Sequence, residues 1–178
     1  PNLDVELYGN LLIEGDDATM NLINEHDHAL TVDSNIIYNA GSLEAGSGTG
    51  ARLILAGDQT QEITGDFSSP NDWHHVEVSN ASDVIVHDHL GLDGELTFTE
   101  GKLLVDDAAL VSVNNTSTTA INGAGPQRYV DGDLRKDFNS GDSFTFPVGD
   151  LDRFGEVELV NVQSSGYWQA RYYNEDPT

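Results

Sequence analysis

Apolar residues at positions i and i+2 recur along the chain every 19 to 23 residues, and this recurrence constrains the fold more than any other feature of the sequence. Residues i and i+2 of a β-strand point to the same side, so each pair predicts a short strand with one buried face. A unit of about 20 residues that holds two or three such strands is typical of one coil of a parallel β-helix. We therefore expect these pairs to be almost fully buried inside a stack of coils: Leu11 and Ile13, Leu30 and Val32, Leu53 and Leu55, Val76 and Val78, Leu96 and Phe98.

The predicted fold class is all-β, with a parallel β-helix (solenoid) over residues 1–123 and a small β module over residues 124–178 that caps the stack. No window shows a sustained helical i, i+3, i+4, i+7 pattern of apolar residues. Turn signals every 8–12 residues would also fit a β-sandwich, so the longer recurrence is what favours the solenoid. The polar, small-residue segment 114–125 is expected to be a loop or linker between the two parts.

The C-terminal module has the composition of a cap. Phe144, Phe146 and Val148 share one face of a predicted strand, and Trp168, Ala170 and Tyr172 share one face of another. An uncovered last coil would expose both its core and its strand edges, so we expect these residues to pack over it. The alternative is that Trp168, Tyr172 and Tyr173 form a platform on which sugar rings stack.

The charge of the chain restricts its partners. Asp and Glu outnumber Lys and Arg by 31 to 7, which gives a formal net charge of −24. Binding to nucleic acid needs clustered Lys and Arg, so nucleic acid is not an expected partner. The same charge disfavours anionic membranes and keeps the surface dispersed. It fits a protein surrounded by salt or divalent cations.

The sequence also restricts covalent chemistry and topology. It has no cysteine, so disulfides, thiolate metal sites and cysteine nucleophiles are absent. No apolar run approaches the length of a membrane span, and no signal peptide is present, so membrane insertion is not expected. The chain begins at Pro1 without Met and ends shortly after a strong strand pattern. We expect it to be a piece of a longer protein with a truncated C-terminal module.

Three phrases of the sequence carry a resemblance to a known family: GDQTQEITG (residues 57–65), VEVSN (76–80) and GELTFTEG (94–101). They resemble the repeat region of large secreted surface proteins of Bacteroidetes, in which G-x-Q-x-I-x-G precedes L-x-V-x-N and G-x-L-T-L-x-x-G. The first phrase departs from that pattern by one extra residue before Ile63. The segments GPQRYVDGDLRKDF, SFTFPVGD, RFGEVEL and GYWQARYYNEDP are similar to the module that follows such repeats. The resemblance covers roughly residues 50 to 178.

This resemblance implies an extracellular, cell-surface, adhesin-like β-helix region that is exported by the type IX secretion pathway through a signal absent from this chain. The implied partners are other segments of the same long polypeptide or the export machinery, with glycans or cell surfaces as candidate ligands. The resemblance implies no catalytic residue.

Two His-Asp-His triplets are candidate metal ligands, His26-Asp27-His28 and His87-Asp88-His89. Two histidines at i and i+2 of one strand can chelate a transition metal ion. Around the second triplet, Val84 and Val86 should face inward and the histidines outward. Two ligands alone bind weakly, so solvated surface histidines are the favoured interpretation.

Asp131-Gly132-Asp133, with Asp137, resembles a fragment of a calcium-binding loop but lacks the later bidentate Glu. A hairpin turn between residues 128–130 and 134–138 is the favoured interpretation. Calcium stays the one candidate cofactor, and no residue is assigned as catalytic, cofactor-binding or metal-binding.

The sequence has no G-x-S-x-G elbow, phosphate-binding loop or H-E-x-x-H motif. A polysaccharide lyase or hydrolase of the β-helix type is the alternative function, because 31 acidic residues supply candidate carboxylate pairs without selecting one. The sequence therefore favours a non-catalytic structural and adhesive segment of a secreted cell-surface protein over an enzyme.

Overall fold

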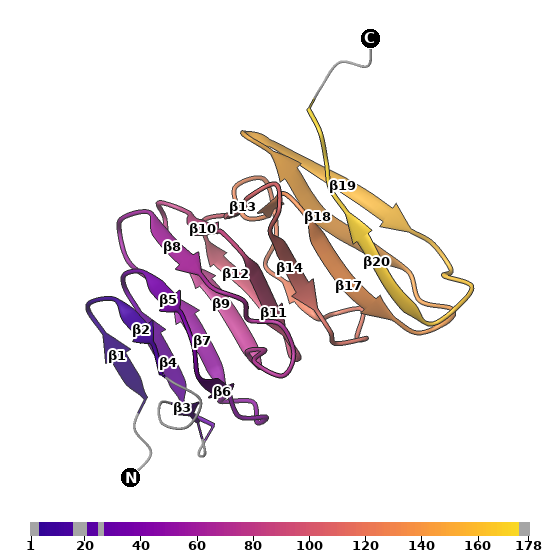
Figure 1. The fold of residues 1–178 in the computed structure, drawn as a ribbon. Coiled ribbons are helices and arrows are strands. Elements are labelled where there is room, and N and C mark those ends of the chain that lie inside the picture. Colours follow the sequence, from indigo (N-terminus) through magenta and orange to yellow (C-terminus); the bar gives the residue numbers. More distant parts are fainter. Residues whose placement is uncertain (1–3, 16–20, 25–26, 175–178) are drawn as a thin grey trace.

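The computed structural model describes residues 4–15, 21–24 and 27–174 of the chain. These residues form an all-β solenoid of about five turns, and none of them lies in a helix that could cross a membrane. Figure 1 shows the coils stacked side by side, with the two described ends of the chain at opposite ends of the stack.

Parallel strands form three sides of the solenoid. One sheet contains, in spatial order, β1 (Val5–Leu7), β4 (Ala29–Val32), β7 (Arg52–Leu55), β9 (His75–Ser79), β12 (Leu96–Glu100) and β15 (Ile121–Asn122). A second contains β2 (Leu11–Ile13), β5 (Ile36–Tyr38), β8 (Gln61–Thr64), β10 (Val84–Val86), β13 (Leu103–Val105), β16 (Val130–Asp131), β18 (Phe144–Asp150) and β19 (Arg153–Leu159). The third side consists of the pair β3 (Asn21–Ile23) and β6 (Ser42–Glu44), and of β11 (His89–Leu92), β14 (Leu110–Val113), β17 (Leu134–Phe138) and β20 (Gly166–Ala170).

The predicted apolar pairs line the core, with two exceptions. Eight of the ten residues are buried: Ile13, Val32, Leu53, Leu55, Val76, Val78, Leu96 and Phe98. Leu11 and Leu30 are only partly buried. Both lie in the first two coils, where fewer neighbouring strands cover them, so the expectation of near-complete burial is wrong for these two residues.

The register also corrects the first step of the recurrence. Leu30, Leu53, Val76 and Leu96 occupy one row of the first sheet. The counterpart of Leu30 in the first coil is Val5, whereas Leu11 lies in the second sheet opposite Ile36. The spacing from Leu11 to Leu30 therefore joins strands on different sides of the solenoid, because an i, i+2 apolar pair looks alike in either sheet.

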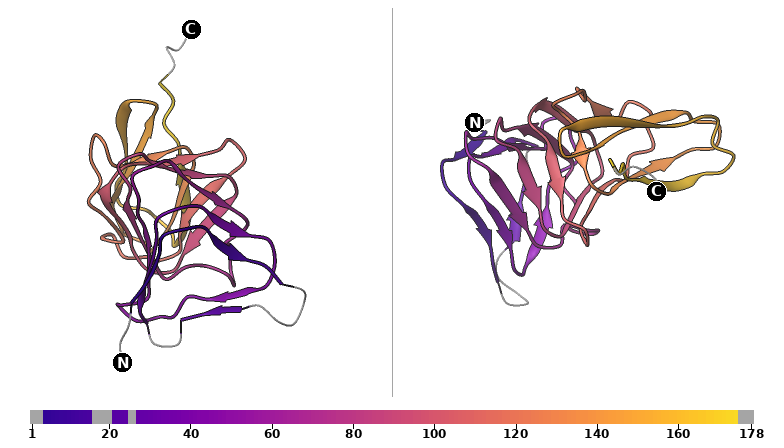
Figure 2. Two further views of the ribbon diagram at one scale, coloured as in Figure 1. Left: turned by 90° about the vertical axis from the view of Figure 1, so that its left-hand side faces the viewer. Right: turned by 90° about the horizontal axis from the view of Figure 1, so that it is seen from above.

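The stack ends in antiparallel strands. β18 pairs parallel with β16 and antiparallel with β19, and β20 pairs antiparallel with β17. Phe138, Phe144 and Phe146 pack between these two layers, with ring centroids 5.2 to 5.9 Å apart. The right-hand view of Figure 2 shows these layers continuing beyond the solenoid. The chain is thus a parallel β-helix followed by a small β module.

Two local expectations for this end are wrong. Segment 114–125 is not simply a loop, because Ala120 is fully buried and β15 pairs with β12. Residues 128–138 do not form a hairpin, because β16 and β17 stack in parallel on β13 and β14 in different sheets. Gly132, with a φ of 134°, turns the chain at the corner between them.

Candidate functional site

The outer side of the sheet β11, β14, β17 and β20 carries imidazole, hydroxyl, guanidinium, carboxylate, amide and aromatic side chains, and we call it the β11–β20 face. Its strands alternate between core-lining residues and residues on this face. The central row across the four strands is Gly91, Ser112, Arg135 and Gln169. His89 and Leu110 lie beside this row on one side, and Asp137 and Tyr167 on the other.

Two tyrosines at the β20 end of this face are each in contact with a guanidinium group. The Arg135 guanidinium lies 5.2 Å from the ring centre of Tyr167, and the Arg171 guanidinium lies 5.0 Å from that of Tyr173. The tyrosines are 65% and 61% exposed. Arg171 also donates a hydrogen bond of 2.6 Å to Asp107, which raises the pKa of its guanidinium. No ion pair joins Arg135 to a carboxylate among the described residues.

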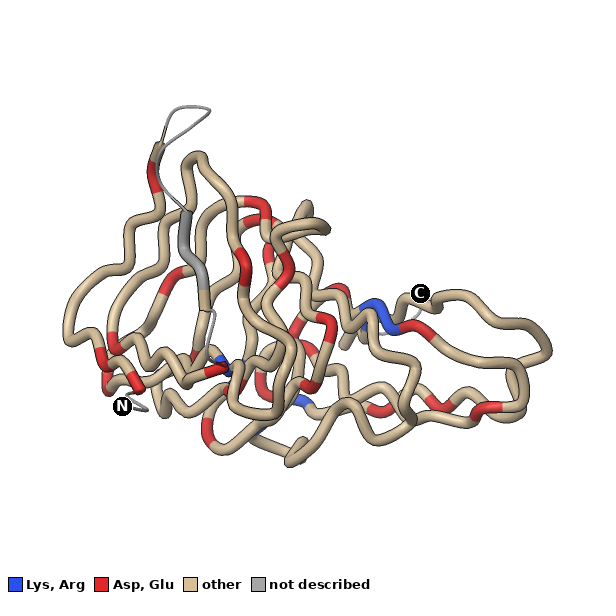
Figure 3. Tube along the Cα trace, turned by 90° about the horizontal axis from the view of Figure 1, so that it is seen from below, with Lys and Arg blue, Asp and Glu red and all other residues tan. Residues whose placement is uncertain are grey.

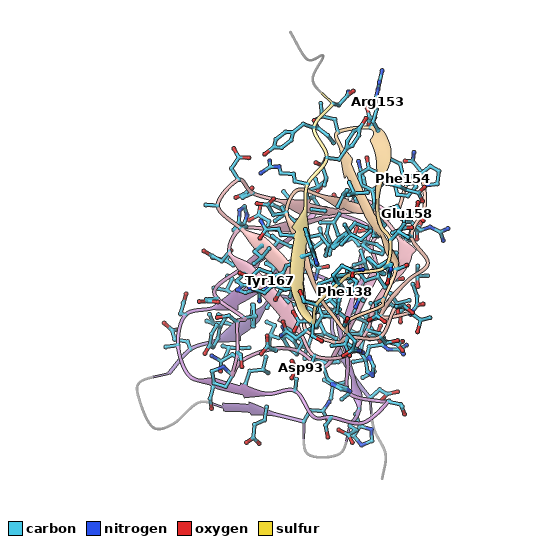
Figure 4. The ribbon with its side chains drawn as sticks, turned by 90° about the vertical axis from the view of Figure 1, so that its right-hand side faces the viewer. Asp93, Phe138, Arg153, Phe154, Glu158 and Tyr167 are labelled. Carbon is cyan, nitrogen blue, oxygen red and sulfur yellow. The ribbon has the colours of Figure 1, made fainter. Side chains whose placement is uncertain are left out.

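The aromatic residues expected to cap the stack are divided between burial and exposure. Ala170 is buried, and Tyr172 packs against the core and closely beside Gly155. Trp168 is 50% exposed, although it shares the inward side of β20 with Ala170. It lies opposite Lys136 at the open end of the two layers, so the expectation that it packs as part of the cap is only half met. Figure 4 looks onto this end and labels Phe138 and Tyr167.

Ser112, His89 and Asp66 form an arrangement that superficially resembles a hydrolase triad. Ser112 Oγ lies 2.7 Å from His89 Nε2, and His89 Nδ1 lies 3.8 Å from Asp66 Oδ1. A triad serine must reach the substrate carbonyl. Ser112 is 0% exposed, and burial together with the charge of Arg135 lowers the pKa of His89. The contact therefore satisfies the hydrogen-bonding requirement of a buried hydroxyl group.

An acidic cleft of about 420 Å³ lies beside Asp93, where the chain leaves β11. Its carboxylates belong to Asp27, Glu44, Asp72 and Asp93. Asn114 Nδ2 donates hydrogen bonds of 3.1 Å to Asp72 and 3.3 Å to Asp93. Burial and the nearby Asp93 charge raise the pKa of Asp72. The described residues include no group of three His, Asp or Glu side chains arranged to hold a metal ion.

In the first His-Asp-His triplet, His26 lies outside the described residues. Asp27 has a φ of 55°, and its carboxylate accepts a hydrogen bond of 3.0 Å from the Ser47 amide. Hydrogen bonds from the Gly48 and Ser47 amides lower the pKa of Asp27. A Cβ atom at Gly46 or Gly48 would lie within 2.4 Å of this carboxylate. The glycine-rich segment therefore wraps around Asp27, which explains its composition.

The second triplet is split by a corner. Val84 and Val86 are buried, as predicted. The chain then turns, so His87 follows β10 in the second sheet while His89 begins β11 in the third. His87 lies 2.8 Å from Asp106 and 3.5 Å from Glu62, and the hydrogen bond to Asp106 raises its pKa. The two histidines thus have separate partners, and the expectation that they share a strand is wrong.

The Asp131-Gly132-Asp133 fragment is also divided between sides of the solenoid. Asp131 ends β16 and accepts a hydrogen bond of 2.8 Å from the Leu151 amide. Burial raises its pKa. Asp133 precedes β17, and Asp137 lies on the β11–β20 face opposite Tyr167.

The sequence interpretation did not single out Arg135, Tyr167, Gln169, Ser112 or Asp107. The alternation in GYWQAR was a usable signal, since it places Tyr167, Gln169 and Arg171 on the side opposite Trp168 and Ala170. No signal in the sequence pairs Arg135 with Tyr167, because that contact depends on β20 returning beside β17. Comparison with protein-family models, curated proteins and solved structures finds no match to this chain.

Proposed function

We propose that this chain is a non-catalytic structural and adhesive segment of a long exported protein at the cell surface, where it serves as a rigid spacer with a binding face. The observation that carries the proposal is the stacking of parallel strands around one apolar core: the first and second sheets continue from coil to coil without a break, and two further sheets form the third side. Each coil is hydrogen-bonded to its neighbours and adds about 4.8 Å of length. Such a stack resists bending because bending would break ladders on one side.

The distribution of charge supports a role in an open, aqueous setting. Acidic residues are spread along the solenoid, as Figure 3 shows, and basic residues are few. Mutual repulsion between such surfaces keeps the molecules apart. Secretion by the type IX pathway, and contact with other segments of the same polypeptide or with the export machinery, rest on the sequence resemblance alone.

The alternative is a polysaccharide-degrading enzyme. A single experiment separates the two functions: incubation with a panel of acidic and neutral polysaccharides, with retention and the release of reducing or unsaturated ends both measured. We expect no product release. If the chain releases products and a single Asp or Arg substitution abolishes that release, the spacer proposal is contradicted and the chain is an enzyme.

The spacer role has its own measurement. Small-angle X-ray scattering of the purified chain should give the profile of a stiff, elongated particle that does not change shape with salt concentration. A profile of a flexible chain would contradict the proposal, whatever the polysaccharide assay shows.

A further inference from the structure

The exposed aromatic residues of this chain are concentrated at one place. Among the described residues, the exposed large aromatic side chains are Tyr8 in the first coil and Tyr167, Trp168 and Tyr173 around β20. Isolated exposed apolar residues are ordinary, but a group of exposed aromatic rings marks a contact surface. Tyr167 lies in β20 and Tyr173 follows its end, six positions along the chain, a separation of at most about 20 Å if that chain is extended.

The polar side chains near Tyr167 and Tyr173 include hydrogen-bond donors and hydrogen-bond acceptors. Arg135 and Gln169 are neighbours in the central row of the β11–β20 face, and Asp137 is the direct neighbour of Tyr167. Arg135 supplies guanidinium donors that no carboxylate of the described residues occupies. Gln169 supplies one donor group and one acceptor, and Asp137 supplies acceptors. Hydroxyl groups, which donate and accept at once, match this combination.

We propose that the outer side of β17 and β20 binds an uncharged polysaccharide. Tyr167 and Tyr173 stack against sugar rings, and Arg135, Asp137 and Gln169 bond to hydroxyl groups between them. Each tyrosine ring has a guanidinium against it, which orients the ring and limits the side-chain entropy lost on binding. The inference rests on the proposed adhesive function and names its ligand class.

Charge decides against an acidic polymer. The chain as a whole carries −24, and Asp107, Asp133 and Asp137 lie near Arg135 and Arg171. Arg171 is already paired with Asp107. An anionic chain would therefore gain one free guanidinium and face the repulsion of the surrounding carboxylates.

Surface composition decides against a protein partner. The centre of a protein–protein interface is more apolar than the rest of the surface, with aromatic residues and Arg enriched and Asp, Glu and Lys depleted. Apart from the tyrosine rings, Leu110 is the one apolar side chain on the outer side of β11, β14, β17 and β20. A surface of rings set among polar groups suits a hydroxyl-rich ligand.

Affinity electrophoresis in gels that contain uncharged glucans, xylans or mannans tests the proposal, with uronic-acid polymers in parallel gels. We expect at least one uncharged polymer to retard the protein to the same extent at low and physiological salt. Tyr167→Ala should weaken this binding about tenfold, the equivalent of ~1.4 kcal/mol. Tyr167→Phe, which keeps the ring, should bind like the wild type.

Tyr8→Ala is the matched control, because Tyr8 is at least as exposed as Tyr167 but lies in the first coil. It should leave retardation unchanged, and circular dichroism should give all three variants the wild-type melting temperature. The proposal is overturned if no uncharged polymer retards the protein, or if Tyr167→Ala is retarded like the wild type. Salt-sensitive retention by uronic-acid polymers alone would also overturn it. Each of these results leaves the spacer function intact, since that function is tested by scattering and product release.

Discussion

Buried amide side chains fix the corners of the coils. Asn80 is fully buried, and its Nδ2 donates to the carbonyl oxygens of Ala56 and Gln59 at 3.2 and 2.9 Å. Gln61 Nε2 donates to the carbonyl oxygens of Val32 and Ser34. A Cβ atom at Gly101 would lie 1.9 Å from the Asn80 carbonyl oxygen. These residues belong to the three short phrases of the sequence, so the phrases mark corners that need buried amides and close backbone approach.

Lys136 is a buried basic residue that lies among carbonyl oxygens and aromatic rings. It is 0% exposed, and its Nζ donates to the carbonyl oxygens of Asn115 and Asp137 at 2.7 and 2.9 Å. The rings of Phe138 and Phe144 lie 4.7 and 5.3 Å from the ammonium. Burial lowers its pKa to about 8, because carbonyl oxygens and ring faces replace only part of the lost hydration.

Lys136 should make stability rise with pH. Between pH 8 and 10.5 the unfolded chain keeps the Lys136 proton while the folded chain loses it, so folding is favoured as pH increases. The whole shift corresponds to at most about 3 kcal/mol. The measurement is the free energy of unfolding from urea titrations between pH 7 and 10, with Lys136→Met for comparison. The variant should lack this rise.

The urea titrations stop at pH 10 because above that pH Tyr129 makes stability fall as pH rises, which opposes the effect of Lys136. Burial raises the pKa of Tyr129 to about 12, so the stability that this residue contributes is complete below pH 10 and declines as pH rises towards 12. Equal pH slopes for the wild type and Lys136→Met would contradict the role assigned to Lys136.

At the scale of the strand, position in the stack decides how much an apolar side chain contributes. Leu30 and Leu53 are neighbours in one row and have the same local pattern. Leu53 is 1% exposed, whereas Leu30 is only partly buried. In the described part of the chain, one strand of the first sheet lies on the β1 side of Leu30 and two lie on that side of Leu53, so fewer side chains cover Leu30.

Leu53→Ala should therefore destabilise the fold more than Leu30→Ala. Truncation of a fully buried leucine typically costs about 2–5 kcal/mol, and a partly buried one loses less transfer free energy and leaves no closed cavity. Chemical denaturation of the two variants measures both values. Equal losses of unfolding free energy for the two variants would contradict the prediction, because they would mean that position in the stack does not matter.

At the scale of the molecule, charge repulsion opposes folding along the whole solenoid. The formal net charge of the chain is −24, and Figure 3 shows acidic residues spread along the described part of the stack. Sodium chloride shortens the Debye length from about 30 Å at 0.01 M to about 10 Å at 0.1 M. We expect the melting temperature to rise over this range, as followed by circular dichroism.

Calcium provides the comparison at constant ionic strength. If the acidic residues act through charge repulsion alone, adding a chelator at fixed ionic strength should leave the melting temperature unchanged. A fall on chelation would instead indicate an ion bound to the native state alone, which stabilises by mass action.

The sequence by itself determined the strands, most of the core and the class of fold. A period of two in apolar residues depends only on near neighbours, which is why Leu53 and Leu55 or Val76 and Val78 could be placed inside. Turn residues mark corners for the same local reason. The pattern could not say which side of the solenoid a strand joins, and so Leu11 was placed in the wrong row and residues 128–138 in a hairpin.

Tertiary structure alone decided the β11–β20 face. Its contacts join residues far apart in the chain, such as His89 with Ser112 or Arg171 with Asp107, 64 residues away. Whether such residues meet depends on how many residues each corner contains and on the antiparallel return of β20. One residue more at a corner would turn every later side chain of that strand to the other side, so the identity of these neighbours follows from the register of the stacked coils.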